Sequence, residues 1–166
     1  YNATTNPIGY QGGDNGSERT NREHVLLKNA VAAIASQVPA DLNIDNDNNG
    51  TVDNVCFIVS GSPNGWASLL WPHMWSLYSQ YAYINGKRVY TFNFQIQSST
   101  MSSGVGVLCH EMFHTLGAPD LYHYSYDGIH PAWKWDIMEY NQNPPQHMTM
   151  YMKWKYGKWL STMPTI

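Results

Sequence analysis

The sequence predicts a domain of the α+β class, with helices and a small sheet built from separate stretches of the chain. Three observations predict it. Apolar residues recur at helical spacing over residues 20–37. The apolar stretch VCFIVSG at 55–61 is typical of a buried strand, and the stretches YAYI and RVYTFNFQIQ flank Asn85–Gly86 as the strands of a hairpin do. A second helix is expected over about residues 104–116, where Gly117 would end it.

The remaining stretches have weaker patterns. Residues 1–19 are expected to be irregular, and residues 62–79 to form loop and surface structure, because Pro72 prevents a continuous helix there. The stretch 98–103 would introduce the helix that follows it. A last helix is expected over about residues 145–156.

Composition narrows the class of protein. The chain has 166 residues, of which 43% are hydrophobic and 13% charged, so we expect one folded domain over residues 1–166. The net charge is −3 and no Lys or Arg run occurs, which argues against a nucleic-acid partner. No apolar run approaches the roughly 18 residues of a membrane helix. We therefore expect a monomer without a membrane segment.

Cysteine usage and composition bear on location. Cys56 and Cys109 lie in apolar stretches, and we expect two buried free thiols, with a disulfide as the alternative. Low charge and many Asn and Tyr favour a secreted, cell-surface or periplasmic protein. The stretch YNATTNPIGY lacks the regions of a signal peptide, so an exported form is expected to have lost its signal.

The stretch CHEMFHTLGAPDLY, residues 109–122, predicts a zinc site. Residues four apart on a helix have β-carbons about 5–6 Å apart, so His110 and His114 can hold one ion. The carboxylate of Glu111 can reach a water on that ion and take its proton. A catalytic zinc needs a third protein ligand and an open position. Gly117 can turn the chain back, and Asp120 then arrives as the expected third ligand, with His123 or a distant residue as alternatives.

An acidic loop predicts a second metal site. Its oxygen side chains alternate as in calcium loops, and Gly50 supplies the sharp turn. The expected calcium ligands are Asp45, Asp47, Asn49, Thr51 and Asp53. Cys56 stands where a helix-loop-helix site has its glutamate, so Asp41, Asn43 or water would complete the shell. The alternative is an Asx-rich turn without metal.

The stretch HEMFHTLGAPDLY resembles the active-site helix of the immune inhibitor A family of bacterial secreted zinc metallopeptidases, in the metzincin clan. The stretches DNDNNGTVDNVCFIVSG, LLWPHMWSL, WDIMEY and PPQHMTMYMKWKYGKWL fit the same resemblance, which covers most of residues 41–160. It implies a metzincin-like fold: a twisted sheet with a backing helix, an active-site helix beneath the cleft, and a turn that carries a methionine below the metal, called the Met-turn.

The resemblance also implies roles for particular residues. Met138 would be the Met-turn residue, although by composition alone it is ordinary core. Tyr140 would stabilise the oxyanion, with a packed tyrosine as the alternative. The implied activity is a zinc-dependent endopeptidase, in which Glu111 activates a zinc-bound water against a peptide bond of a protein substrate, held extended along a sheet edge. Family members usually carry an earlier strand and often a propeptide, so this chain is expected to lack both or to come from a larger precursor.

Two other functions are left open. One is a non-catalytic, calcium- and zinc-stabilised extracellular binding module; a structural zinc site would need four ligands and no Glu111. The other is an inactive truncated core. Side chains outside the motifs have weaker expectations. His73 and the tryptophans are expected to pack or to line a substrate cleft, His24 to lie on the polar side of its helix, and His130 and His147 on the surface; the tryptophans are Trp66, Trp71 and Trp75.

Overall fold

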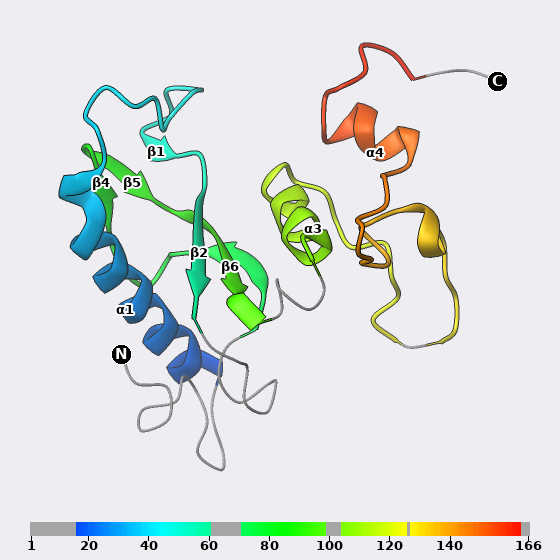
Figure 1. Cartoon of the computed structure of the whole chain (residues 1–166), viewed down its shortest axis with the longest axis horizontal. Helices are drawn as coiled ribbons and strands as arrows, with labels where there is room; N and C mark the ends of the chain where they lie inside the picture. The colour runs from blue at the N-terminus through cyan, green and yellow to red at the C-terminus, as the bar shows by residue number, and fades with distance from the viewer. Residues whose placement is uncertain (1–15, 61–70, 99–103, 126, 164–166) are drawn as a thin grey trace. The chain divides into compact units, whose positions relative to one another are not determined.

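The computed structural model describes residues 16–60, 71–98, 104–125 and 127–163, with side chains from residue 20 onward. The chain divides into two compact units, of which the first ends at Ile96 and the second begins at Gln97 (Figure 1). The first unit contains the acidic loop and the second contains the zinc motif. That the two together form a single catalytic domain stays a prediction.

Helices and strands are both present, which confirms the α+β class. The helices are α1 (Gly16–Ile34), the 3₁₀ helix η1 that follows it (Ala35–Gln37), α3 (Gly106–Thr115), the 3₁₀ helix η3 (Trp133–Trp135) and α4 (Met150–Lys155). The strands are β1 (Thr51–Val52), β2 (Val55–Val59), β3 (His73–Ser76), β4 (Tyr83–Ile84), β5 (Lys87–Val89) and β6 (Thr91–Ile96). None of the helices in the described ranges is long and apolar enough to cross a membrane.

The strands of the first unit form two small sheets. One has the order β1-β5-β4 and the other β2-β6-β3, with β1–β5 and β2–β6 parallel. The predicted hairpin is confirmed: β4 and β5 pair antiparallel across Asn85 and Gly86, whose φ angles are 49° and 77°. Two positive φ angles in a two-residue turn match the twist of the strands on either side.

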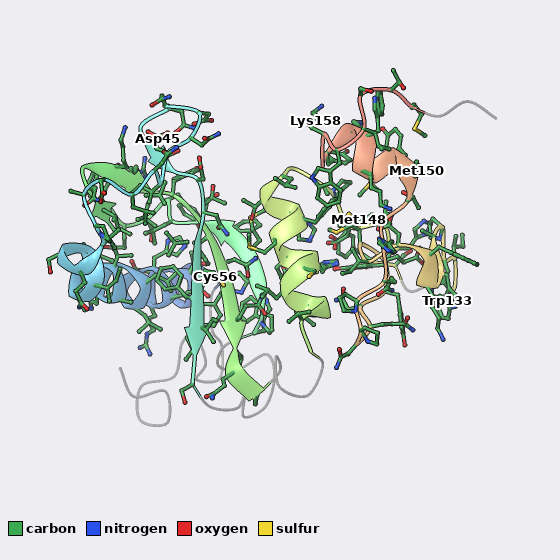
Figure 2. The ribbon with its side chains drawn as sticks, turned by 45° about the horizontal axis from the view of Figure 1, so that its top comes forward. Asp45, Cys56, Trp133, Met148, Met150 and Lys158 are labelled. Atoms are coloured by element: carbon green, nitrogen blue, oxygen red, sulfur yellow. The ribbon has the colours of Figure 1, made fainter. Side chains whose placement is uncertain are left out.

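The core of the first unit joins α1 to both sheets, and α1 lies along one side of the strands (Figure 1). Leu27 and Val31 of α1 are 1% exposed and pack with the buried side chains of the strands. Strand β2 buries only one face, because its residues alternate between the core and solvent. Cys56, labelled on β2 in Figure 2, is therefore exposed, and the expected burial of this thiol is wrong. Cys109 is half-buried, and both thiols are free.

One stretch expected to be loop contains a strand. Residues 73–76 form β3, which pairs antiparallel with β6. Pro72 does not prevent this, because a proline just before a strand removes no hydrogen bond from the ladder. Trp66 and the stretch 99–103 lie outside the described residues.

The second unit has its own core around α3. This core consists of Phe113, Ala118, Ile137, Met138 and Met152. Helix α4 begins later than residue 145, because the backbone N–H of Ile137 donates to the carbonyl of His147 at 3.2 Å and keeps that stretch extended. At the start of α3, a β-carbon on Gly106 would lie 2.2 Å from the carbonyl oxygen of Gln142, so only glycine fits there.

Candidate metal centre

Helix α3 supplies two histidines one turn apart. His110 is 4% exposed, and its Nε2 lies 3.1 Å from Nε2 of His114. The helix ends at Thr115, and two residues later Gly117 has a φ of 90°, which is strained for any residue with a β-carbon. This turn brings the carbonyl of Ala118 back to the ring of His114.

Backbone carbonyls fix the tautomers of both rings. Nδ1 of His110 lies 2.8 Å from the carbonyl oxygen of Ile137, and Nδ1 of His114 lies 2.7 Å from that of Ala118. A carbonyl oxygen can only accept, so each Nδ1 carries a proton. In the neutral rings each Nε2 therefore presents a lone pair to the other, as in metal-binding histidines.

Asp120 completes a group of three ligand atoms. Its Oδ1 lies 3.0 Å from Nε2 of His110 and 3.2 Å from Nε2 of His114. This oxygen is buried and has no hydrogen-bond donor in the described part of the chain. Three electron-pair donors that face one another repel, and a cation between them removes the repulsion. Two imidazoles and one carboxylate, all within 4.8 Å of one another, fit the three-ligand set of a catalytic zinc.

Ionisation agrees with this arrangement. Burial alone would raise the pKa of Asp120, but the Tyr124 hydroxyl and, whenever they are protonated at Nε2, the imidazoles of His110 and His114 donate to this carboxylate and hold that pKa far below its usual value. Burial would likewise lower the pKa of His114, but Asp120 and the Ala118 carbonyl outweigh burial and raise it. A proton and a metal ion therefore compete for the same lone pair, as expected of a metal ligand.

The alternative third ligand lies elsewhere. Nδ1 of His123 lies 2.9 Å from Oδ2 of Asp127, and His123 is not among the converging ligand atoms. Asp127 also accepts from the Ile129 backbone, which makes a local turn of this loop. Of the two residues that the spacing offered, the structure brings Asp120 to the histidines.

Two tyrosines that the sequence reasoning missed lie beside Asp120. The Tyr122 ring stacks on the His110 ring, with centroids 6.4 Å apart and an interplanar angle of 18°. The Tyr124 hydroxyl donates a hydrogen bond to Oδ2 of Asp120. That hydrogen bond is the main cause, and burial the second, of a raised pKa of Tyr124, so its hydroxyl keeps its proton. The one feature of the sequence that could have indicated these two tyrosines is their spacing of two residues from Asp120, at positions 122 and 124.

The segment that contains Met138 is held by a buried carboxylate. Asp136 is 0% exposed; its Oδ1 accepts from the Met138 backbone at 2.9 Å and its Oδ2 from the Thr149 backbone at 2.7 Å. Ile137, between them, provides the carbonyl for His110. Met138 is 0% exposed and packs with Phe113 in the core beside the histidines. Asp136 thus positions His110, a candidate ligand, through the backbone, and only its place two residues before Met138 could have indicated this.

The predicted catalytic residues have different surroundings. Glu111 is half-buried on α3, next to His110. Tyr140 is 40% exposed, and its ring lies 5.6 Å from that of Trp133 and beneath the ammonium of Lys134. None of its hydrogen bonds or ring contacts within the described residues involves the three ligands. Its neighbour Glu139 is buried and accepts from the backbone of Ala132 and Trp133 and from His130, which fixes the loop before the Met138 segment.

The acidic loop brings its carboxylates together. Ligand oxygens of Asp45, Asp47 and Asp53 lie within 4.8 Å of one another, and Gly50 has a φ of 86°. These carboxylates already accept several hydrogen bonds from the backbone of the loop itself. Asp45, labelled in Figure 2, is 4% exposed, accepts from the backbone of Asn49 and Gly50, and lies 2.7 Å from the ammonium of Lys87. The loop therefore combines the oxygen set of a calcium site with the internal hydrogen bonds of an Asx-rich turn.

The remaining oxygens of this loop are also engaged. Asn49 and Thr51 bond to each other: Oδ1 of Asn49 accepts from the backbone N–H of Thr51 at 2.8 Å and from its hydroxyl. Asp47 accepts from the Asn49 backbone at 3.2 Å, and Asp53 from the Asn46 backbone at 3.1 Å. A cation in this loop would have to replace or share these bonds.

Two histidines of the first unit take part in its core. His24 is 0% exposed, so its expected place on the polar side of α1 is wrong. The Ser79 backbone N–H donates to Nδ1 of His24 at 3.3 Å, which leaves the proton on Nε2. Nε2 of His73 lies 3.1 Å from the buried carboxylate of Glu23, a polar contact within this core, and its ring stacks against that of Trp71. Trp75 is 55% exposed, and His130 and His147 are exposed as expected.

Comparison with known proteins places these residues in a family. A search of curated protein sequences gave no match. The family model described as immune inhibitor A peptidase M6, catalytic domain, matches residues 39–142, more than half of the chain. The matched segment includes the acidic loop, α3, Asp120 and Met138, so it spans both candidate metal sites. The chain thus belongs to the immune inhibitor A peptidase M6 family of metallopeptidases.

Proposed function

We propose that this chain is the catalytic region of a zinc-dependent endopeptidase, with His110, His114 and Asp120 as the zinc ligands. The observation that carries the proposal is the buried Oδ1 of Asp120, which has no donor in the described chain and faces two histidine lone pairs. Zinc suits this donor set, and three protein ligands are the number typical of catalytic zinc.

The proposed reaction is hydrolysis of a peptide bond. Zinc, when bound, supplies Lewis acidity that polarises a carbonyl and lowers the pKa of water. In this reaction Glu111 takes a proton from the attacking water and delivers it to the leaving amine. The support for this role is its position: Glu111 follows His110 on the same helix and is half-buried there. The Ile137 and Ala118 carbonyls keep the two histidines in the tautomer that binds metal. The role of Tyr140 as oxyanion donor rests on the family resemblance alone, as does the place of Met138 beneath the metal.

The acidic loop is proposed to bind calcium for stability. Its support is the convergence of the carboxylates of Asp45, Asp47 and Asp53 and the left-handed turn at Gly50, with Asn49 and the Thr51 carbonyl as further oxygens. Lys87 neutralises Asp45 in the same place. Calcium must displace this ammonium, so the expected affinity is weak, about 0.1–1 mM as in extracellular modules.

A protein or peptide substrate follows from the family. The further expectations, a secreted, cell-surface or periplasmic monomer that comes from a larger precursor, are proposals that rest on composition and on the resemblance. The rival functions, a binding module stabilised by zinc and an inactive truncated core, share the ligands but make no use of Glu111 in chemistry.

The test is hydrolysis of an unfolded protein by the zinc-loaded chain, beside Glu111→Gln. Glu111→Gln keeps the shape of the side chain and removes its basicity. We expect cleavage by the parent chain and a loss of about 10²–10⁴-fold in the variant, with equal zinc content in both. Equal activity of the two would refute Glu111 as the base. Zinc binding without cleavage by either would support the two rivals instead.

A further inference from the structure

The carboxylate of Asp120 has two oxygens with different surroundings. Oδ1 faces His110 and His114, whereas Oδ2 accepts the hydrogen bond of the Tyr124 hydroxyl. Without that bond the carboxylate could rotate about its last torsion, which is broad for aspartate, and exchange or combine its two oxygens at the metal.

We propose that Tyr124 is a positioning residue that holds Asp120 as a one-oxygen ligand of the metal. This inference rests on the proposed zinc site and adds a residue to it. A phenol hydroxyl is neutral and donates one hydrogen bond, so it occupies Oδ2 without competing for the cation. Groups that hydrogen-bond to metal ligands in this way orient them and tune their basicity.

The geometry of the loop supports the assignment. His123 lies between Tyr122 and Tyr124 in sequence, but its ring pairs with Asp127, whereas both tyrosines contact the metal-ligand group. The two tyrosine rings meet edge to face, with centroids 5.1 Å apart and an interplanar angle of 75°. Tyr122 stacks on His110, and Tyr124 leans on Tyr122 while its hydroxyl reaches Asp120. His110 therefore has a ring against it, and Asp120 has the Tyr124 hydroxyl as a donor at Oδ2, with the Tyr122 hydroxyl also interacting with this carboxylate.

Tyr124 adds little to the stability of the fold, because its side chain is 72% exposed. Removing only the hydroxyl, in Tyr124→Phe, keeps the ring contact with Tyr122. A matched control exists next to it: the Ser125 hydroxyl donates to Oδ2 of Asp127 at 3.0 Å, so Ser125→Ala removes a hydroxyl bonded to the other aspartate of the same loop.

The experiment measures the zinc dissociation constants of the three proteins by competition with a chromophoric chelator, and the visible spectra of their Co²⁺ forms. We expect Tyr124→Phe to raise the zinc dissociation constant about 10–100-fold and to change the Co²⁺ bands. The changed bands would report a second Asp120 oxygen at the metal. We expect Ser125→Ala to match the parent chain, and the unfolding midpoints of all three metal-free proteins to agree.

Three results would overturn the inference. Parental zinc affinity and spectrum in Tyr124→Phe would show that the hydroxyl does not position Asp120. Equal losses in Tyr124→Phe and Ser125→Ala would assign the effect to loop order. A parent chain that binds no zinc would overturn the zinc site together with this inference, whereas the first two results leave the zinc site standing.

Discussion

Asp136 offers the sharpest test of how the second unit holds its proposed metal ligands. Asp136→Asn preserves shape but replaces one carboxylate oxygen by an NH₂ group. Oδ1 and Oδ2 accept from the backbone N–H groups of Met138 and Thr149, at 2.9 and 2.7 Å, and the side chain is fully buried. The amide can satisfy one of these donors but not both, so one buried N–H loses its partner.

The magnitude follows from these contacts. A hydrogen bond to a charged acceptor contributes about 1.5–3 kcal/mol, and an unsatisfied buried donor costs about 1–3 kcal/mol. Because the neutral amide is easier to bury, we expect a net loss of about 2–4 kcal/mol in the free energy of opening this segment. The matched control is Asp127→Asn, which lies in an exposed turn. Oδ1 of Asp127 accepts from the Ile129 backbone at 3.0 Å. Its expected cost is below about 1 kcal/mol.

The assay is hydrogen exchange of the metal-free chain, read at the amides of Met138 and Thr149. The expected loss corresponds to about 30-fold or faster exchange in Asp136→Asn. Zinc affinity should fall as well, because Ile137 then holds His110 less firmly. Parental exchange rates, or rates equal to those of Asp127→Asn, would refute the view that Asp136 fixes this segment.

Three further predictions concern both units. Asp120→Ala should abolish tight zinc binding while His123→Ala leaves it unchanged, measured as zinc content after dialysis; the reverse pattern would make His123 the ligand. Lys87→Met should raise calcium affinity roughly two- to fivefold in calorimetry, because the ammonium 2.7 Å from Asp45 no longer competes, and an unchanged affinity would reject that competition. Burial lowers the pKa of His24 below 6.5, so just below pH 6.5 the unfolded chain binds a proton at His24 and the folded chain does not. Stability should therefore fall as the pH falls below 6.5, by at most about 1.4 kcal/mol per pH unit, and urea unfolding of His24→Gln should show a smaller pH dependence.

The local elements could be predicted because each has a short-range cause. Helical spacing predicted α1, although the helix begins at Gly16 and so includes residues 16–19, which were expected to be irregular. The Asn85–Gly86 pair predicted its hairpin, and Gly117, with a φ of 90°, predicted the end of α3, which lies two residues earlier at Thr115. Strand β3 was missed because its pairing with β6 is a tertiary contact and the stretch has no clean period of its own. His24 was misplaced for a similar reason, since its ring contacts Ser79, 55 residues away, and the rings of Tyr78 and Phe92, which are all distant in sequence.

The candidate site divides along the same line. The convergence of the three proposed ligands could be predicted because α3 and the turn after it set their spacing within eleven residues. The groups that orient His110 and His114 could not be predicted, because they belong to the backbone. The carbonyls of Ile137 and Ala118 fix the tautomers, and every residue has a carbonyl, so the sequence does not distinguish these two. Side chains influence these backbone carbonyls only indirectly, as Asp136 does by accepting a hydrogen bond from the backbone next to Ile137. We therefore expect that a substitution near Ile137 weakens the proposed metal site without touching His110, His114 or Asp120, and that identity at these three positions alone does not give a relative the same metal affinity.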